Sequence, residues 1–352
     1  MGVKTISNIQ KKYWELSIPW IVHFELTYQC NLKCRHCYIV PNKSDYELNL
    51  SEIKRILEEL AKIGTMALTF SGGEIFLRKD ILDILDFATK RFYVFLLTNG
   101  TLITKKTAQK LKELGILRVE ISLYGRKEIH ERITRTKGSF DKVISALGCL
   151  KEAKVPITLK CLALKENLEE YSYLKEIAKH FRAKFKPGFL VYPKTNGDKE
   201  PCSYRIPKEY ESEYLSSWLS EIKNIQTNTK THQAFRRNGI CNAGRIFCSI
   251  TPNGDVHPCV MLPWNLGNLR ERSFRSIWQE DISQELKMLR SLSITDFPRC
   301  SQCEIRDFCV PCIGLNYLEN NDIFKCSAEY CRLAYWLKGN IIKGRCNYEA
   351  TL

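Results

Sequence analysis

The chain has 352 residues, of which 44% are hydrophobic, 26% charged and 11% aromatic, a mixture typical of a folded protein and not of a disordered one. Its formal net charge is +15, and it contains 16 cysteines. No apolar run reaches the roughly 18 residues of a membrane span, and the first residues lack a signal-peptide pattern. We therefore expect a cytoplasmic protein without membrane contact, in which clustered cysteines indicate metal ligands or catalytic groups and not disulfides.

The excess of Lys and Arg by itself would suggest an acidic partner such as nucleic acid. The basic residues are scattered along the chain, however, and no basic stripe interleaved with aromatic residues occurs. Nucleic-acid binding is therefore a weak alternative.

Short β-branched runs alternate with longer helical patterns over residues 21–192, which predicts a parallel sheet built from βα units. The predicted strands are residues 21–27, 66–70, 93–97, 118–123, 157–164 and 185–191. The predicted helices between them are residues 51–63, 79–90, 105–114, 139–153 and 167–181. Ser51 is the predicted N-cap of the first of these helices, without a full capping box. Six units favour an α/β fold with an open, partial (βα)6 barrel over a closed barrel of eight units.

A run rich in Pro, Gly and charge, PKTNGDKEPCSYR, ends the predicted barrel and divides the chain. We expect the barrel domain in residues 1–195, a connector with a bridging helix at 209–223 in residues 196–240, and a small irregular cysteine-rich domain in residues 241–352. One clear helix is predicted near 275–292. Because so irregular a domain buries little apolar surface, metal clusters must contribute to its folding.

Cys30, Cys34 and Cys37 form a CxxxCxxC motif directly after the first predicted strand. Three thiolates on one loop can hold three irons of a four-iron cluster and leave the fourth iron open to another ligand. A zinc site completed by His36 is the alternative, but zinc motifs usually combine CxxC pairs. The CxxxCxxC motif lies at the carboxyl end of a strand, where ligands bind in α/β folds, and this position indicates an active site.

This motif, with His36 before its last cysteine, resembles that of the radical S-adenosylmethionine (SAM) superfamily. Gly72, Gly73 and Glu74 follow the second predicted strand as the GGE motif of that family does. The resemblance implies that Glu74 and the adjacent backbone hold the methionine amino group of SAM. A carboxylate accepts hydrogen bonds from an ammonium group, and glycines let the backbone approach a ligand.

Further cofactor contacts are implied by the same resemblance. It places Asn99 near the cofactor and Ser122 at the ribose or carboxylate of SAM, although a strand-ending turn is the alternative for Asn99. Lys160 and Arg135 are candidates for the SAM carboxylate, with a solvated surface charge as the alternative for each. Cofactor contacts are also implied for His36 and Tyr38.

In this family the open iron binds SAM, and one electron cleaves SAM to a 5′-deoxyadenosyl radical that abstracts hydrogen from an unactivated carbon. The cluster ligands Cys30, Cys34 and Cys37 are therefore the candidate catalytic residues.

The later cysteines resemble the SPASM extension of radical SAM enzymes. They are spaced as Cys241-x6-Cys248-x5-Gly254-x4-Cys259, then Cys300-x2-Cys303-x5-Cys309-x2-Cys312, then Cys326 and Cys331. One spacing departs from that of the extension: two residues separate Cys309 from Cys312, where the extension has three. The resemblance implies one auxiliary cluster on Cys241, Cys248, Cys259 and Cys312, and another on Cys300, Cys303, Cys309 and Cys331. Cys326 competes with Cys331, and a zinc site over residues 300–312 is the alternative. We thus expect three [4Fe-4S] clusters.

Cysteines outside these sets have simpler interpretations. Cys149 and Cys161 are expected to be small buried hydrophobic residues. Cys202 and Cys346 lie in polar surroundings and are candidate hydrogen-atom donors.

The resemblance implies an enzyme that modifies a peptide by thioether or carbon–carbon cross-linking, epimerisation or oxidation. A small-molecule substrate such as a tetrapyrrole is the alternative; a noncatalytic iron–sulfur interaction protein is disfavoured by the three-cysteine motif with Glu74.

Because the motif begins only thirty residues into the chain, we expect a separate recognition protein or a substrate without a leader. A small electron donor such as flavodoxin or ferredoxin is also implied. Val260 and Met261 after Cys259 argue against sulfatase maturation, whose members carry an acidic base there.

Overall fold

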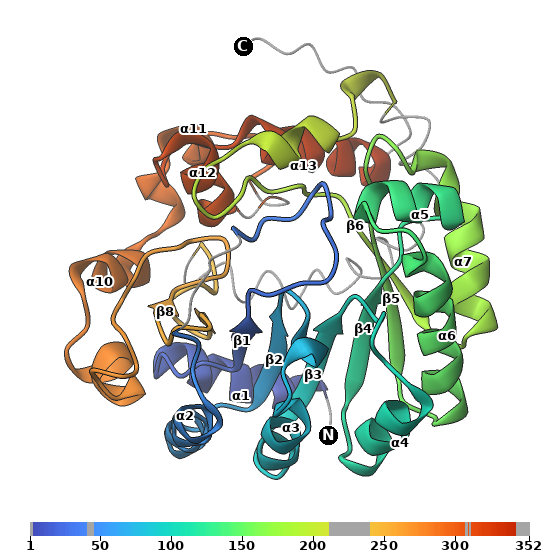
Figure 1. The fold of residues 1–352 in the computed structure, drawn as a ribbon. Helices are drawn as coiled ribbons and strands as arrows, with labels where there is room; N and C mark the ends of the chain where they lie inside the picture. Colours follow the sequence, from blue (N-terminus) through green and yellow to red (C-terminus); the bar gives the residue numbers. More distant parts are fainter. Residues whose placement is uncertain (1–2, 41–45, 211–239, 307–308, 310, 343–352) are drawn as a thin grey trace.

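A computed structural model describes residues 3–40, 46–210, 240–306, 309 and 311–342. Eight strands form one curved sheet in the order β6-β5-β4-β3-β2-β1-β7-β8, and every neighbouring pair except β7–β8 is parallel (Figure 1). The strands are β1 (Ile21–Thr27), β2 (Ala67–Gly72), β3 (Tyr93–Thr98), β4 (Arg118–Ser122), β5 (Ile157–Leu162), β6 (Lys184–Gly188), β7 (Phe247–Ile250) and β8 (Val256–His257). The partial barrel predicted from the sequence is therefore confirmed.

Helices alternate with the first six strands and lie outside the sheet (Figure 1). They are α2 (Leu50–Ile63), α3 (Ile81–Thr89), α4 (Lys105–Glu113), α5 (Lys127–Thr134), α6 (Ser139–Glu152) and α7 (Tyr171–His180). The other helices are α1 (Val3–Glu15), α10 (Gln284–Ser291), α11 (Pro298–Ser301), α12 (Ile313–Asn320) and α13 (Ala328–Ile342). Figure 1 shows α12 and α13 across the barrel interior from the strands.

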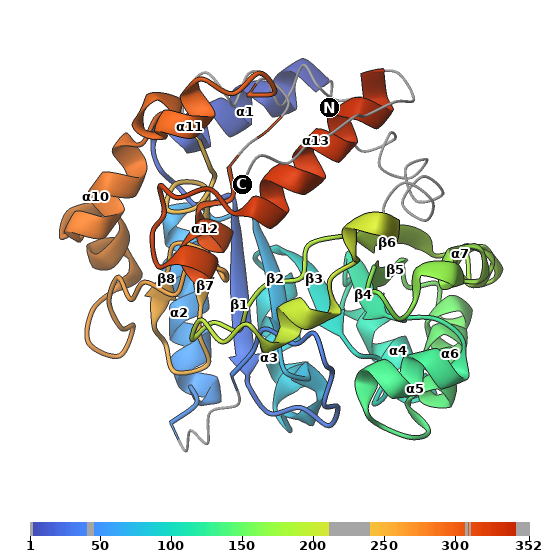
Figure 2. The ribbon, with the colours of Figure 1, turned by 90° about the horizontal axis from the view of Figure 1, so that it is seen from above.

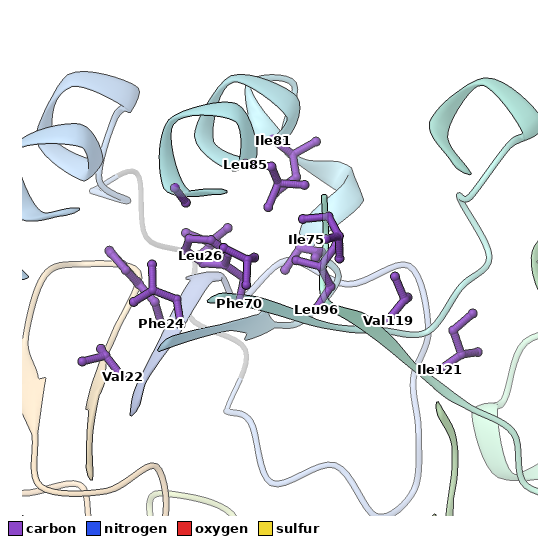
Figure 3. Close-up of a cluster of buried hydrophobic side chains, with 14 of the residues drawn as sticks. Val22, Phe24, Leu26, Phe70, Ile75, Ile81, Leu85, Leu96, Val119 and Ile121 are labelled. Carbon is purple, nitrogen blue, oxygen red and sulfur yellow. The ribbon is translucent and has the colours of Figure 1, made fainter. Parts of the chain in front are cut away.

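The apolar core lies between the strands and the outer helices. Phe24 and Leu26 of β1 and Phe70 of β2 pack toward Ile81 and Leu85 of α3, and all five are at most 5% exposed (Figure 3). Because side chains alternate along a strand, His23, Glu25 and Thr27 of β1 face the barrel interior instead. This alternation leaves the interior of the barrel polar and available for a functional site.

The sheet is longer than the six strands that the sequence predicted. β7 pairs with β1, so that Val22 lies beside Cys248 and Phe24 beside Ile250, and β8 continues the sheet (Figure 2). Residues after 240 therefore complete the barrel sheet as well as forming the cysteine-rich region. The domain boundaries expected from the sequence stay a prediction.

Several helix boundaries differ from the sequence prediction. Asn49, not Ser51, is the N-cap of α2; its side chain accepts from the Glu52 N–H while Glu52 accepts from the Asn49 N–H, so the capping box is complete. The single helix predicted near 275–292 is two, a π-helical turn (Ser276–Glu280) and α10. They separate because the Ser283 hydroxyl caps α10 by accepting from the Leu286 N–H.

Five of the observed helices, α1, α5, α11, α12 and α13, were not predicted. The predicted bridging helix at 209–223 falls almost wholly outside the described residues. In the described part of the chain, no helix combines the length and the apolar character needed to cross a membrane.

We expect Asn49→Ala to lower the free energy of unfolding by about 1 kcal/mol, because the substitution leaves N–H groups of the first turn of α2 without an acceptor. Chemical denaturation of the purified protein measures this change. Ser51→Ala is the matched control, since the Ser51 hydroxyl is exposed and only donates to Asn49. An equal or larger loss in Ser51→Ala would contradict the assignment of the cap.

Candidate active site

The three cysteines of the CxxxCxxC motif lie on the loop after β1. The loop is fixed to the end of α5, because the Lys33 and Arg35 N–H groups donate to backbone carbonyls of residues 134 and 133. Cys30, Cys34 and Cys37 line one cavity of about 680 Å³. The structure therefore brings the three thiols to a common space at the carboxyl end of the barrel.

The GGE turn is held tightly against the segment that precedes Cys30. The Gly73 N–H donates to the Thr27 carbonyl at 2.7 Å, and the Glu74 N–H donates to the Gln29 carbonyl at 2.8 Å. A Cβ atom on Gly73 would lie 2.1 Å from the Gln29 carbonyl oxygen, and one on Gly72 would lie 2.1 Å from that of Thr27. Glycine is required at both positions because two backbones meet there.

The Glu74 carboxylate points away from the cavity. It is fully buried and accepts from the Thr98 hydroxyl at 2.7 Å, from the Asn99 N–H at 2.7 Å and from the Phe76 N–H at 3.1 Å. Burial raises its pKa, and these hydrogen bonds oppose that effect. Only Gly72 and Gly73 of the motif line the cavity, so the geometry favours a backbone contact with SAM over a carboxylate contact.

Asn99 connects the GGE turn to the cysteine loop. Its Nδ2 donates to Asn31 Oδ1 at 2.8 Å and lies 3.9 Å from the Cys30 Sγ, while its Oδ1 accepts from Thr101. Asn31 in turn donates to Thr101. Asn99 lines the cavity, and its contact with the cofactor stays a prediction. No sequence signal pointed to Asn31.

His36 and Tyr124 form one wall of the cavity. The His36 Nε2 lies 3.0 Å from the Tyr124 hydroxyl, and the His130 ring stacks on the Tyr124 ring. Burial lowers the pKa of His36 to about 4, so its ring is neutral at pH 7. The His36 Nδ1 is buried and has no hydrogen-bond partner among the described residues, which leaves it for a ligand. Sequence reasoning missed Tyr124.

Charged and polar side chains from β4, β5 and β6 line the opposite part of the cavity. Ser122 pairs in register with Lys160, and the Lys160 Nζ lies 3.3 Å from Glu120. Lys186 contacts the same Glu120 at 3.7 Å, so two ammonium groups share one carboxylate. Arg135, also at the cavity, lies 4.0 Å from the exposed Glu200.

Tyr38, a predicted cofactor contact, belongs to a buried group that sequence reasoning missed. Its hydroxyl donates to Glu25 at 3.3 Å, and the Tyr28 hydroxyl donates to the other Glu25 oxygen at 3.1 Å. Burial raises the pKa of Glu25 to about 7, although both hydrogen bonds lower it. The two tyrosine rings line the cavity, and Glu25 lies behind them.

Cys241, Cys259 and Cys312 interact electrostatically with one another. Burial, together with a smaller effect of the neighbouring thiols, raises the pKa of Cys241 to about 11 and that of Cys259 to about 12. Iron cations would offset this cost by favouring the thiolates. Cys248 lies in the barrel core on β7 and interacts with Cys259 and Arg290.

The second auxiliary set has five neighbouring cysteines where a cluster needs four. Cys300 interacts with Cys303, Cys309 and Cys331, and its Sγ lies 2.7 Å from that of Cys326. Cys326 also forms a hydrogen bond with Cys331. The structure thus brings both candidates for the fourth ligand to the same place. No three of the described His, Cys, Asp and Glu side chains converge on the position of a single metal ion.

The remaining cysteines lie apart from these sets. Cys161 is buried on β5 as expected, but it also lines the cavity and accepts from Asn167. Cys149 is partly buried on α6, and Cys202 is partly buried after β6. Cys346 falls outside the described residues.

These donors fit the groups that the motifs imply. Three thiols share a cavity with the exposed backbone of Gly72 and Gly73, and His36, whose Nδ1 has no partner among the described residues, lines the same cavity. Such an arrangement can hold an iron–sulfur cluster through three ligands beside a polar cofactor.

Comparison with known proteins agrees with this chemistry. A model of the radical SAM superfamily matches residues 24–177, and a model of the SPASM iron–sulfur cluster-binding domain matches residues 241–304. An AdoMet-dependent heme synthase of Methanosarcina barkeri is 30% identical over 340 residues, which cover 89% of this chain and 96% of that protein. The chain therefore belongs to the radical SAM superfamily, carries a SPASM domain and is an enzyme that uses SAM and iron–sulfur clusters.

A further relative and a solved structure are also similar to this chain. The antilisterial bacteriocin subtilosin biosynthesis protein AlbA of Bacillus subtilis is 28% identical over 320 residues, covering 86% of this chain and 69% of AlbA. The crystal structure of Streptococcus suis SuiB bound to S-adenosylmethionine shares the fold, with a TM-score of 0.70 and 17% identity over 93% of this chain and 82% of SuiB.

We expect Gly73→Ala to abolish tight SAM binding while leaving iron content close to that of the wild type. The added Cβ cannot fit beside the Gln29 carbonyl, so the turn must move away from the cysteine loop. Equilibrium binding of SAM to the reconstituted protein measures the loss. Gly148→Ala in α6 is the matched control, because a Cβ there meets nothing within 4 Å. Wild-type SAM affinity in Gly73→Ala would refute the role of the turn.

Proposed function

We propose that this enzyme abstracts hydrogen from the carboxylate-bearing side chain of a tetrapyrrole, with SAM and three [4Fe-4S] clusters as cofactors. SAM, bound to the open iron of the first cluster, supplies a 5′-deoxyadenosyl radical when one electron cleaves it. Cys30, Cys34 and Cys37 hold that cluster, and the other two occupy the auxiliary sets. A small donor such as flavodoxin or ferredoxin supplies the electron, and we expect the reaction in the cytoplasm.

Different residues of the cavity bind different parts of SAM. The backbone of Gly72 and Gly73 receives the methionine end, and Ser122 and Lys160 lie where its carboxylate or ribose would reach. Glu74 acts indirectly, by holding Asn99 against the cysteine loop. His36 and Tyr38 form the walls that exclude water from the radical.

The charge of the cavity supports a substrate that bears carboxylate groups. Cationic side chains outnumber carboxylates among its described lining residues, which include Lys33, Arg35, Arg135, Lys160, Lys186 and Lys194 against Glu120 and Glu200. Lys186 and Lys160 share a single carboxylate, so one positive charge is left uncompensated beside Ser122. A cavity with this balance attracts carboxylate groups. The similarity to a heme synthase over nearly the whole chain supports a tetrapyrrole as their carrier.

Peptide modification, which the sequence favoured, is the second candidate. The similarity to the subtilosin biosynthesis protein AlbA supports it. The cationic cavity would then receive an acidic or C-terminal carboxylate of the peptide, with a separate recognition protein presenting it. Thioether or carbon–carbon cross-linking, epimerisation and oxidation remain the candidate reactions.

The substrate class is tested anaerobically with the reconstituted protein, SAM and dithionite. One arm contains a propionate-bearing iron porphyrin, and the other contains peptides encoded beside the gene. We expect mass spectrometry to detect a changed porphyrin and one equivalent of 5′-deoxyadenosine per product. A modified peptide with an unchanged porphyrin would establish the second candidate instead.

Cofactor assignment leads to a separate prediction. We expect about twelve irons per chain after reconstitution, four per cluster. Replacing Cys30, Cys34 and Cys37 together by Ala should remove about four irons and all 5′-deoxyadenosine formation, because SAM loses its iron. Cys149→Ala is the control that should keep both. Undiminished SAM cleavage in the triple variant would overturn the active-site assignment.

A further inference from the structure

Tyr192 lies in the segment after β6 and contacts both the cavity and the first auxiliary cysteine set. Its side chain lines the same cavity as Cys30, Cys34 and Cys37. Its hydroxyl lies 4.0 Å from the Sγ of Cys312, within the range of a hydrogen bond to sulfur. Tyr192 is therefore a direct link between the space for the substrate and the proposed ligands of an auxiliary cluster.

The segment that follows Cys259, a second thiol of that set, also reaches the cavity. Met261, two positions after Cys259, lines the cavity as Tyr192 does. The first auxiliary set thus approaches the cavity closely at this wall.

Cys312 has little freedom to move away from Tyr192. It is the N-cap of α12, and Gly314 in the first turn packs so closely that a Cβ there would lie 2.6 Å from the Met261 carbonyl oxygen. The backbone of α12 therefore rests on the segment that follows Cys259. This contact restrains the backbone that carries Cys312.

The other auxiliary set has a tyrosine of its own, which provides an internal comparison. The Tyr335 hydroxyl of α13 lies 3.6 Å from the Cys303 Sγ. Tyr335 is not among the lining residues of the cavity. A hydroxyl therefore faces one sulfur in each set, but only Tyr192 joins its set to the site of hydrogen abstraction.

We propose that Tyr192 is a positioning residue that makes the cluster on Cys241, Cys248, Cys259 and Cys312 the acceptor of the electron that leaves the substrate radical. This inference rests on the proposed function above. The hydroxyl donates to the Cys312 thiolate, and such hydrogen bonds to cluster sulfurs raise a reduction potential by stabilising the extra negative charge of the reduced cluster. In this step the substrate radical loses one electron and the cluster gains that electron. A neighbouring group of the substrate releases one proton, which leaves for the solvent, as the closed-shell product forms.

The test is Tyr192→Phe, which removes the hydroxyl and keeps the ring. Redox titration followed by electron paramagnetic resonance is performed in the background with Cys30, Cys34 and Cys37 replaced by Ala, so that only the auxiliary clusters contribute. We expect the potential of one auxiliary cluster to fall, with a change of about threefold to tenfold in the equilibrium constant for its reduction, or about 30 to 60 mV for one electron. Tyr335→Phe, the matched control, should shift the other cluster and leave this one unchanged.

In the background with the first cluster intact, Tyr192→Phe should lower the yield of product per 5′-deoxyadenosine, because more substrate radicals fail to lose their electron. Tyr335→Phe should keep the wild-type ratio. Unchanged potentials in Tyr192→Phe, or loss of a cluster's iron in place of a shift, would overturn the inference. Wild-type protein that yields neither a modified porphyrin nor a modified peptide would instead count against the proposed function, since the potentials are measured without substrate.

Discussion

The site depends on the close approach of two backbones, the GGE turn after β2 and the segment after β1. The hydrogen bonds from Gly73 to Thr27 and from Glu74 to Gln29 join them with no room for a side chain between. The turn that we propose to face SAM and the loop that carries Cys30 are therefore one rigid unit. A small error in this distance would misplace the cofactor relative to its iron, and radical chemistry depends on such placement.

The acid of the GGE motif stabilises this unit from behind. Each carboxylate oxygen of Glu74 is already an acceptor for groups of the chain, from Thr98, Asn99 and Phe76. A buried carboxylate satisfied in this way fixes its donors strongly, because leaving them unpaired away from water is costly. The motif thus orients Asn99 and the end of β3 in addition to forming the turn.

Much of the fold could be predicted from the sequence because buried parallel strands are short apolar runs. The predicted start of β1 at Ile21 is confirmed, and the other five predicted strands lie within a few residues of their observed ends. The pairing of β7 with β1 could not be predicted, since it joins residues more than 200 positions apart and depends on no local pattern. The predicted N-cap of α2 was wrong because Asn49 and Ser51, two positions apart, are both good N-cap residues.

Spacing identified the cysteines but not the side chains around them. The motif residues lie together at the cavity, whereas Tyr124, Asn31 and Glu25 are distant from the motifs in sequence or unmarked by any pattern. Their roles come from register and packing between strands. Spacing also does not decide whether Cys326 or Cys331 is the fourth ligand of the second auxiliary cluster, because both thiols lie beside Cys300.

The junction of β7 with β1 has a consequence for how the chain can be truncated. In the intact sheet, Val22 and Phe24 of β1 have a neighbour on each side. A barrel ending before β7 would expose β1 as a parallel edge strand with unpaired N–H and C=O groups, a template for aggregation. The cluster-bearing region therefore cannot be regarded as an appendage on a finished barrel: it closes the edge of the sheet that carries the radical site.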